Sequence, residues 1–228
     1  IGKHAQGTIA YTTSPVHDLN TWIDLAKKIE DAGADSLAIK DMAGLLRPFD
    51  AYELVKNLKS TLSIPIHMQT HATTGMSTAT NMKAIEAGID NIDTSISSLS
   101  MTYGHTATET MLAIFENEER EINLDLSALE EVSIFFKEIR EKYSEFEGNL
   151  KGVDSSMLVK QVPGGMLSNL ESQLRANKQE DKIDLVKDEI PKVRKDFGYP
   201  PLVTPASQIV GAQALLNIMS SRRYENLS

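Results

Sequence analysis

The sequence predicts an α/β protein built on a parallel sheet, and three observations carry this prediction. Apolar segments of strand length alternate with helical segments as far as residue 96. Two stretches nearly repeat, IEDAGADSLAIKD and IEAGIDNIDTSI, and each runs from a helix end through a glycine and an acidic turn into an apolar strand. Polar residues follow successive strands at the same end. Such alternation is typical of right-handed βαβ units, whose strands are parallel.

The expected strands differ in how they are covered. The segment ADSLAIKD is mostly apolar, as expected for a strand covered on both faces. In IPIHMQTHA, His67, Gln69 and His71 stand two residues apart, so they should share one face. Strands are predicted at 7–12, 34–41, 64–72 and 89–96, and a candidate fifth strand lies near 153–160.

The expected helices carry recognisable end signals. Asp18 or Asn20 could cap the first helix, and Gly33 ends it. Pro48 and Asp50 mark the start of the second helix. VPGG at 162–165 is expected to be a turn, and 198–205 an extended segment. Helices are predicted at 20–33, 49–62, 77–88, 124–148, 166–178, 183–196 and 205–220.

The polar strand ends favour a (β/α)8 TIM barrel among α/β folds. Lys40 and Asp41 end one strand and His71 ends the next, so parallel strands deliver these side chains to one rim, where barrel enzymes carry out their chemistry. A doubly wound sheet usually carries a glycine-rich phosphate loop, which we do not find. A whole barrel takes ~250 residues and eight strands. We therefore expect residues 1–160 to form the later part of a barrel whose first strands are missing, and 161–228 to form a helical region.

Composition excludes several classes of function. The net charge of -9 argues against binding to nucleic acid or to an anionic membrane surface. Cysteine is absent, so disulfides and thiolate metal sites are excluded. No apolar run approaches the ~18–20 residues that cross a bilayer, so no direct membrane insertion is expected. We predict a soluble, cytoplasmic protein.

Lys40 is the most informative single residue. It ends an apolar strand, so its ammonium should be partly desolvated, which favours the neutral amine. A neutral amine can form a Schiff base, or can react with CO₂ to give a carbamate whose oxygens bind metals. The alternative is a lysine paired with Asp41 or Asp93 at the barrel rim.

Four further side chains have both a chemical and a structural interpretation. A His-x-His pair on a strand aims two imidazoles at one point and suits a catalytic metal. Here the pair is Gln69 and His71; glutamine is a poor ligand, and hydrogen-bonded core residues are the alternative. Thr204, just before Pro205, could cap the last helix or relay a proton. His105 could be a cap or a substrate contact.

Several longer segments, taken together, resemble the carboxyltransferase subunit of biotin-dependent enzymes. The similarity is greatest to the oxaloacetate decarboxylase α chain and the carboxyltransferase subunit of transcarboxylase, with pyruvate carboxylase as a more distant relative. It extends from Ile1 to about Met219. The segments are IKDMAGLL, THATTG, KAIEAG, DTSISS, MTYGHTATE, QVPGGMLSNLESQL and PPLVTPASQIVG.

The resemblance implies a metal-centred barrel followed by a helical funnel. Such enzymes move a carboxyl group between a 2-oxo acid, oxaloacetate or pyruvate, and biotin on a mobile carrier domain. The carbamylated lysine of the family falls on Lys40, its two metal-ligand histidines on Gln69 and His71, and its proton-shuttling threonine on Thr204. The implied metal is a divalent cation: zinc, cobalt or manganese.

The chain also departs from the family pattern. Gln69 stands in place of a ligand histidine, and His67 stands where the family usually has a non-ligand. The remaining metal ligand, an aspartate of the first strand, and the biotin-bearing AMKM segment have no counterpart. Substrate contacts are expected from Asp41, Met42 and His105.

The implied partners are a biotin carrier domain, companion subunits and further copies of the chain, with any membrane association made through companion subunits. Two alternatives stay open. One is an acyl-CoA lyase of the same barrel superfamily, against which the PGGMLSNLESQL and VTPAS segments argue. The other is a metal-poor, inactive chain with an assembly role, which Gln69 and the missing strands favour.

Overall fold

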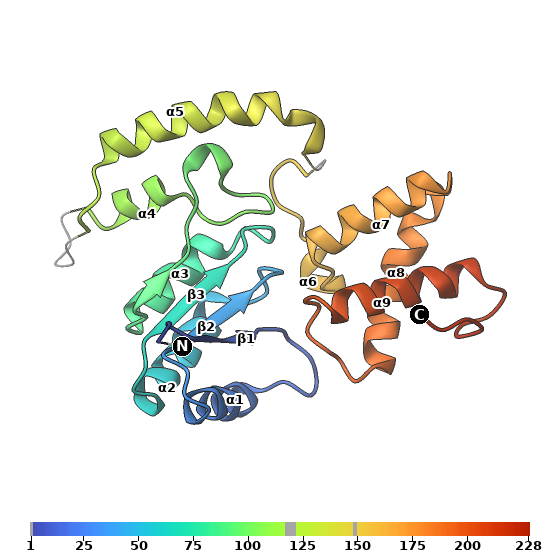
Figure 1. Cartoon of the computed structure of the whole chain (residues 1–228), viewed down its shortest axis with the longest axis horizontal. Coiled ribbons are helices and arrows are strands. Elements are labelled where there is room, and N and C mark those ends of the chain that lie inside the picture. Colours follow the sequence, from blue (N-terminus) through green and yellow to red (C-terminus); the bar gives the residue numbers. More distant parts are fainter. Residues whose placement is uncertain (1, 117–121, 148–149) are drawn as a thin grey trace.

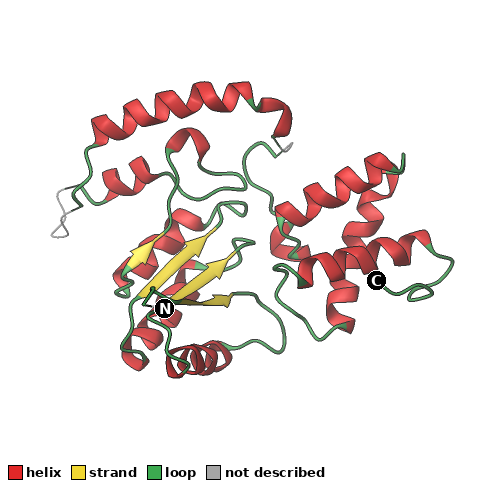
Figure 2. Ribbon diagram, viewed as in Figure 1, coloured by secondary structure: helices red, strands yellow, loops and turns green. Residues whose placement is uncertain are grey.

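The computed structural model describes residues 2–116, 122–147 and 150–228 of the chain. Its centre is a parallel sheet of four strands in the order β1–β2–β3–β4. The strands are β1 (Gln6–Ala10), β2 (Ser36–Asp41), β3 (Ile66–Thr70) and β4 (Asn91–Ile92). Figures 1 and 2 show the strands gathered in one part of the molecule. Sequential parallel neighbours require a crossover after each strand, and helices supply them.

Helices α1 (Leu19–Asp31), α2 (Pro48–Thr61) and α3 (Ser77–Glu86) make these crossovers and cover one face of the sheet. Asp18 starts α1 with a capping box, in which its carboxylate accepts a hydrogen bond from the backbone of Thr21 at 2.8 Å. Pro48 occupies the first turn of α2, where its missing N–H costs nothing.

The pleat of the strands sorts apolar from polar side chains. Ile39 and Met68 are fully buried, and they belong to the apolar core between the sheet and α1–α3. Lys40, His67 and Gln69 are only partly buried, because they project from the opposite face. This second face, which carries the polar side chains, is the one available for chemistry.

A second apolar core lies among the helices of the C-terminal part. These helices are α6 (Met157–Lys160), α7 (Gly164–Ala176), α8 (Ile183–Asp196) and α9 (Ala206–Met219). Met157 still packs into the first core, whereas Val162 already belongs to the second. In Figure 2 the described residues of this part contain helices but no strand.

Helices α4 (Thr108–Ile114) and α5 (Leu126–Lys142) complete the sheet-bearing part, with α5 resting on α4 and on the short turn η1 (Ser97–Leu99). Two more single turns are η2 (Ser144–Phe146) and η3 (Glu180–Lys182). In Figure 1, α5 lies across the top of the molecule, far from α1 and α2.

The four predicted strands and the alternating helices are confirmed, but three local predictions are wrong. The candidate strand near 153–160 contains α6 instead and does not join the sheet, which ends at β4 among the described residues. VPGG is not wholly a turn, since α7 already begins at Gly164. β4 is also shorter than the predicted 89–96, because Ser95 leaves the ladder to bridge Ala107.

None of the helices in the described part of the chain has the combination of length and apolar character that a membrane span needs.

Asp41 is expected to be essential for the stability of the sheet-bearing part. Its side chain is fully buried and accepts hydrogen bonds from the backbone of Leu45 and Leu46 and from the hydroxyl of Thr70. Asp41→Ala leaves these donors buried without a partner, so it should lower the free energy of unfolding by about 3 kcal/mol or more. Urea unfolding of the variant measures this. The control is Asp35→Ala, an aspartate nearer the surface with a side-chain bond to the backbone of Ala5, and an equal loss in both variants would contradict the prediction.

Candidate active site

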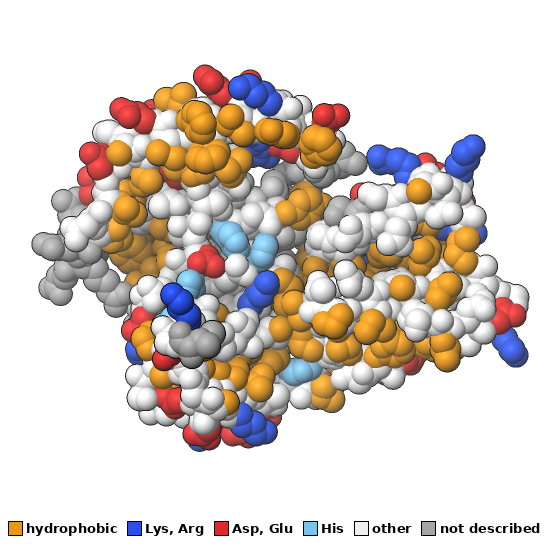
Figure 3. Space-filling model, in the orientation of Figure 1, with side chains coloured by type: hydrophobic (Ala, Val, Ile, Leu, Met, Phe, Trp, Pro, Cys, Tyr) orange, Lys and Arg blue, Asp and Glu red, His pale blue; other side chains and the backbone are white. Residues whose placement is uncertain are grey.

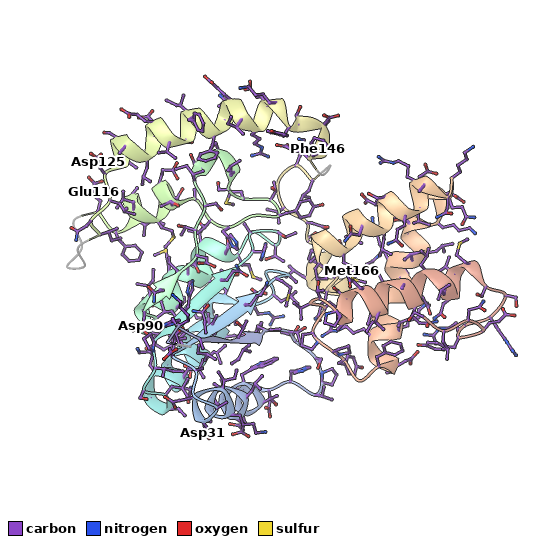
Figure 4. All side chains as sticks on the ribbon, in the orientation of Figure 1. Asp31, Asp90, Glu116, Asp125, Phe146 and Met166 are labelled. Carbon is purple, nitrogen blue, oxygen red and sulfur yellow. The ribbon has the colours of Figure 1, made fainter. Side chains whose placement is uncertain are left out.

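A cavity of about 700 Å³ lies between the carboxyl ends of the strands and the helical part. Lys40, Met42 and His71 line it from the side of the sheet. Thr204 lies on the opposite wall with residues of α7 and α9, among them Met166, which Figure 4 labels on α7. Figure 3 shows histidine side chains gathered near the centre of this face, between the sheet-bearing part and the helical part. The cavity therefore brings together residues far apart in the sequence.

His71 follows β3 and presents a neutral imidazole to this cavity. Its Nδ1 lies 2.6 Å from the carbonyl oxygen of Tyr103. Because a carbonyl only accepts, Nδ1 must carry the proton, and Nε2 keeps a free lone pair. Burial lowers the pKa of His71; the Tyr103 carbonyl opposes this, and the nearby His105 and Lys40 add to it. His71 can therefore bind a cation or accept a hydrogen bond at neutral pH.

Lys40 is half-buried at the end of β2 and lines the same cavity. The alternative of an ion pair is not found: within the described residues, no carboxylate contacts the ammonium. Asp41 is turned into the core, since neighbouring residues of a strand face opposite sides. Asp93 is engaged by two other side chains. The lysine amine is therefore available to a reactant or ligand in the cavity.

Asp93 holds the two polar side chains of β3. His67 Nε2 lies 2.6 Å from one carboxylate oxygen, and Gln69 Nε2 donates to the other at 3.1 Å. Gln69 is not among the residues that line the cavity. Hydrogen bonding to Asp93 is the structural role that the sequence left open for Gln69, and it engages the side-chain amide although Gln69 is the ladder neighbour of Lys40.

Of the three residues expected to contact substrate, only one lines the cavity. Met42 lines the cavity, whereas Asp41 is buried on the other face of the sheet and cannot meet a ligand there. His105 lies beside His71, with ring centres 4.5 Å apart, and its Nδ1 is 3.0 Å from the carbonyl oxygen of Thr70. His105 thus packs against the imidazole of His71 and is not among the residues that line the cavity.

Thr204 does not cap α9. The helix begins at Ala206, Pro205 occupies the cap position after a cis peptide bond, and no side chain hydrogen-bonds to the helix end. The capping interpretation is therefore wrong. The exposed side chain of Thr204 lines the cavity instead.

Four polar residues of the cavity wall were not singled out from the sequence. They come from two helices and carry neutral amide or hydroxyl groups: Asn169, Gln173, Ser207 and Gln208. Asn169 and Gln173 stand four residues apart, so they share one face of α7. An asparagine and a glutamine four residues apart, in a segment predicted to be helical, were the sequence signal that could have identified this part of the wall.

The donors near the cavity fit a divalent cation only in part. No group of three or more His, Asp or Glu side chains in the described part of the chain could hold a metal. His71 offers a free imidazole nitrogen, and the amine of Lys40 would become an oxygen ligand after carbamylation. Gln69, turned toward Asp93, does not fit as a ligand.

Gln69→Ala is therefore expected to change activity and metal content far less than His71→Ala. The glutamine variant loses one hydrogen bond to Asp93, whereas the histidine variant loses an imidazole of the cavity. We expect His71→Ala to lower turnover about 100-fold and Gln69→Ala to lower it by less than about fivefold. Steady-state rates and metal analysis of both variants measure the contrast. Equal losses would show that the glutamine is a ligand after all.

Comparison with known families gives two matches. The family described as "HMGL-like" matches residues 8–135, and the "Conserved carboxylase domain" matches residues 157–228. A pyruvate carboxylase subunit of Methanocaldococcus jannaschii is 49% identical over 226 residues, which are 99% of this chain and 40% of that protein. The methylmalonyl-CoA carboxyltransferase 5S subunit of Propionibacterium freudenreichii subsp. shermanii is 51% identical over 220 residues, 96% of this chain and 43% of that protein.

Solved structures agree with these relatives. The carboxyl transferase domain of Rhizobium etli pyruvate carboxylase with pyruvate superposes with a TM-score of 0.92 at 33% identity, and the match covers 97% of this chain and 38% of that one. Another structure of the carboxyl transferase domain of Rhizobium etli pyruvate carboxylase gives a TM-score of 0.90 at 34% identity, covering 95% of this chain and 38% of that one. The chain therefore spans about two fifths of the length of the relatives that it matches.

Proposed function

Because the chain belongs to the carboxyltransferase family of the biotin-dependent carboxylases, we propose that it moves a carboxyl group between a 2-oxo acid and biotin on a carrier domain. One observation carries the proposal: Lys40, His71 and Thr204, which come from separate parts of the sequence, line a single cavity. The cavity is large enough for a small 2-oxo acid together with the ring of biotin.

In the proposed reaction, oxaloacetate loses its distal carboxyl group. The bond between C3 and that carboxyl carbon breaks, and its electrons form the enolate of pyruvate. The freed CO₂ is attacked by the ureido nitrogen of biotin. The hydroxyl of Thr204 takes the proton from that nitrogen and gives its own proton to C3, so the threonine is unchanged after the cycle.

We propose that His71 and carbamylated Lys40 hold a divalent cation, which is zinc, cobalt or manganese. Such an ion would supply Lewis-acid polarisation of the keto oxygen. His71 contributes the lone pair of Nε2, because Nδ1 is fixed by the Tyr103 carbonyl. His105 keeps the ring of His71 in place. Met42 adds an apolar contact to the wall.

We further propose a division into a barrel part, residues 1–160, and a helical region, residues 161–228. The two apolar cores, which change over between Met157 and Val162, support this boundary. The working assembly would include a biotin carrier domain, companion subunits and further copies of the chain. We place it in the cytoplasm, with any attachment to a membrane made by companion subunits.

An assembly role is the second candidate. It is favoured by Gln69, whose amide faces Asp93 where the family has a ligand histidine. If this role holds, the chain carries no stoichiometric metal and catalyses no transfer.

The two functions are separated by one experiment on the full-length protein. Oxaloacetate is supplied with and without free biotin, pyruvate formation is followed, and bound metal is measured. We expect biotin to accelerate pyruvate formation and a stoichiometric amount of zinc, cobalt or manganese. Pyruvate formation that is indifferent to biotin, in a protein without metal, would refute carboxyl transfer and favour the assembly role.

A further inference from the structure

A single buried arginine joins the two walls of the cavity. Arg194 lies in the last turn of α8 and is 5% exposed. Its Nη2 donates to the hydroxyl of Thr12 at 2.8 Å and to the carbonyl of Thr13 at 3.2 Å. Its Nη1 donates to the side-chain carbonyl of Gln161, and its Nε donates to the carbonyl of Pro200 at 3.1 Å. All three guanidinium nitrogens are therefore engaged.

One end of this arrangement reaches the strand that carries Lys40. β1 is followed by Tyr11 and then by Thr12, which is 3% exposed. The backbone N–H of Tyr11 donates to the carbonyl of Lys40 at 2.9 Å, and Ala10 is the partner of Lys40 in the ladder. Thr12 is thus two residues from the ladder position opposite Lys40. The backbone next to Thr12 is therefore hydrogen-bonded directly to the end of β2.

The other end reaches the segment that carries Thr204. Pro200 lies four residues before Thr204, and the intervening Leu202 and Val203 line the cavity. The contact from Arg194 to the Pro200 carbonyl therefore fixes where this segment begins. The same guanidinium holds a point near Lys40 and a point near Thr204.

The chemistry of the arginine also favours a geometric role. In the described part of the chain, no carboxylate pairs with Arg194: its hydrogen-bond partners are neutral oxygens, and the ring of Tyr199 lies 5.9 Å from the guanidinium carbon. Burying a charge without a counter-ion is costly, so the residue is a poor choice for stability alone. A planar fork of five donors, however, fixes several acceptors in one rigid arrangement, which lysine cannot do.

We infer that Arg194 is a positioning residue, which sets the spacing between Lys40 and Thr204 across the cavity. Its kinetic consequence rests on the proposed function, since only carboxyl transfer needs both walls at once. Its geometric consequence, a fixed placement of the helical part against the sheet, does not depend on that function.

The kinetic test uses the full-length protein with oxaloacetate and free biotin. A misplacement of about 1 Å costs roughly 100-fold in rate, so Arg194→Ala should lower kcat by about that factor while KM for oxaloacetate changes less than about threefold. Arg194→Lys keeps the positive charge but not the planar guanidinium, so its kcat should lie between those of the wild type and Arg194→Ala. Added guanidinium should restore part of the rate of Arg194→Ala, whereas urea at the same concentration should not.

Arg223→Ala is the matched control. Arg223 binds Glu189 and Asp196 of α8, so its side chain ties the chain end to the helical part rather than to the sheet. Its loss should lower stability but change kcat by less than about threefold. A fall in kcat equal to that of Arg194→Ala would show a general effect of destabilisation and overturn the positioning role.

The geometric test measures distance directly and needs no turnover. The 228 residues contain no cysteine, so spin labels attach only at the introduced Lys27→Cys on α1 and Arg175→Cys on α7. The distance between the labels then reports how the helical part lies relative to the sheet-bearing part. Arg194→Ala should broaden or shift the distance distribution, and Arg223→Ala should leave it unchanged. An unchanged distribution in Arg194→Ala overturns the inference whatever the rate. If the wild type transfers no carboxyl group, the proposed function fails, and this measurement still decides the placement.

Discussion

Lys40→Arg is expected to lower the rate of biotin-dependent pyruvate formation by about 1000-fold, the upper range for losing one group of a preorganised site. Arginine keeps the positive charge and much of the length of lysine. It does not offer a neutral amine that can react with CO₂, because its guanidinium stays protonated. The half-buried position of Lys40, free of carboxylate partners within the described residues, is what makes the modification feasible. Bound metal should fall together with the rate.

The matched control is Lys56→Arg on α2. Lys56 lies over the ring of Tyr52, 5.5 Å from its centre, and does not line the cavity, so the same substitution should be silent there. Carbon-13 NMR after incubation with labelled bicarbonate should show a carbamate signal in the wild type and in Lys56→Arg, but none in Lys40→Arg. If Lys40→Arg retains more than about a tenth of the rate, the lysine is not the modified ligand that we propose.

Thr204→Val should lower carboxyl transfer by about 100- to 10,000-fold, the range typical of a lost acid–base group. Valine keeps the branched shape of threonine and removes the hydroxyl, so the shape of the wall is retained. Since Thr204 makes no cap for α9, the substitution should leave the unfolding curve and the metal content unchanged. The rate is measured as carboxyl transfer from oxaloacetate to free biotin.

Thr204→Ser tests the hydroxyl itself. Serine restores the O–H without the methyl group, so much of the rate should return. A Thr204→Val variant with normal turnover, or a serine variant as slow as the valine one, would exclude a proton relay through this side chain. The two outcomes point to different failures: the first removes the role, and the second assigns the loss to packing.

The sheet could be predicted from the sequence because the periodicity is strong where the strands are buried. β2 has an apolar sequence because it lies between β1 and β3 and is buried on both faces over most of its length: Leu37 and Ile39 face the helices, and Ser36 and Ala38 are buried on the other side. β4 was overestimated because the polar residues that follow it are bound elsewhere: Asp93 holds His67, and Thr94 contacts Thr108. Such pairings join residues distant in sequence, and no local pattern reports them.

The candidate site was predictable as far as single strands allow. Because Lys40 and His71 stand at the ends of neighbouring strands, the sequence predicts that they lie at one rim, and both line the cavity. The burial of Asp41 could also have been foreseen, since a strand residue adjacent to Lys40 must face the opposite side. The role of Arg194 could not, because it depends on contact with Thr12, 182 positions away in the chain.

The order of the strands has a consequence for how the chain acquires its structure during synthesis. Each new strand pairs with the one made just before it, so the sheet can grow step by step as the ribosome delivers it. The bond between Arg194 and Thr12 is different, because its donor emerges long after its acceptor. The link between the two walls of the cavity therefore forms only after synthesis has passed Arg194, when all four described strands have already been made.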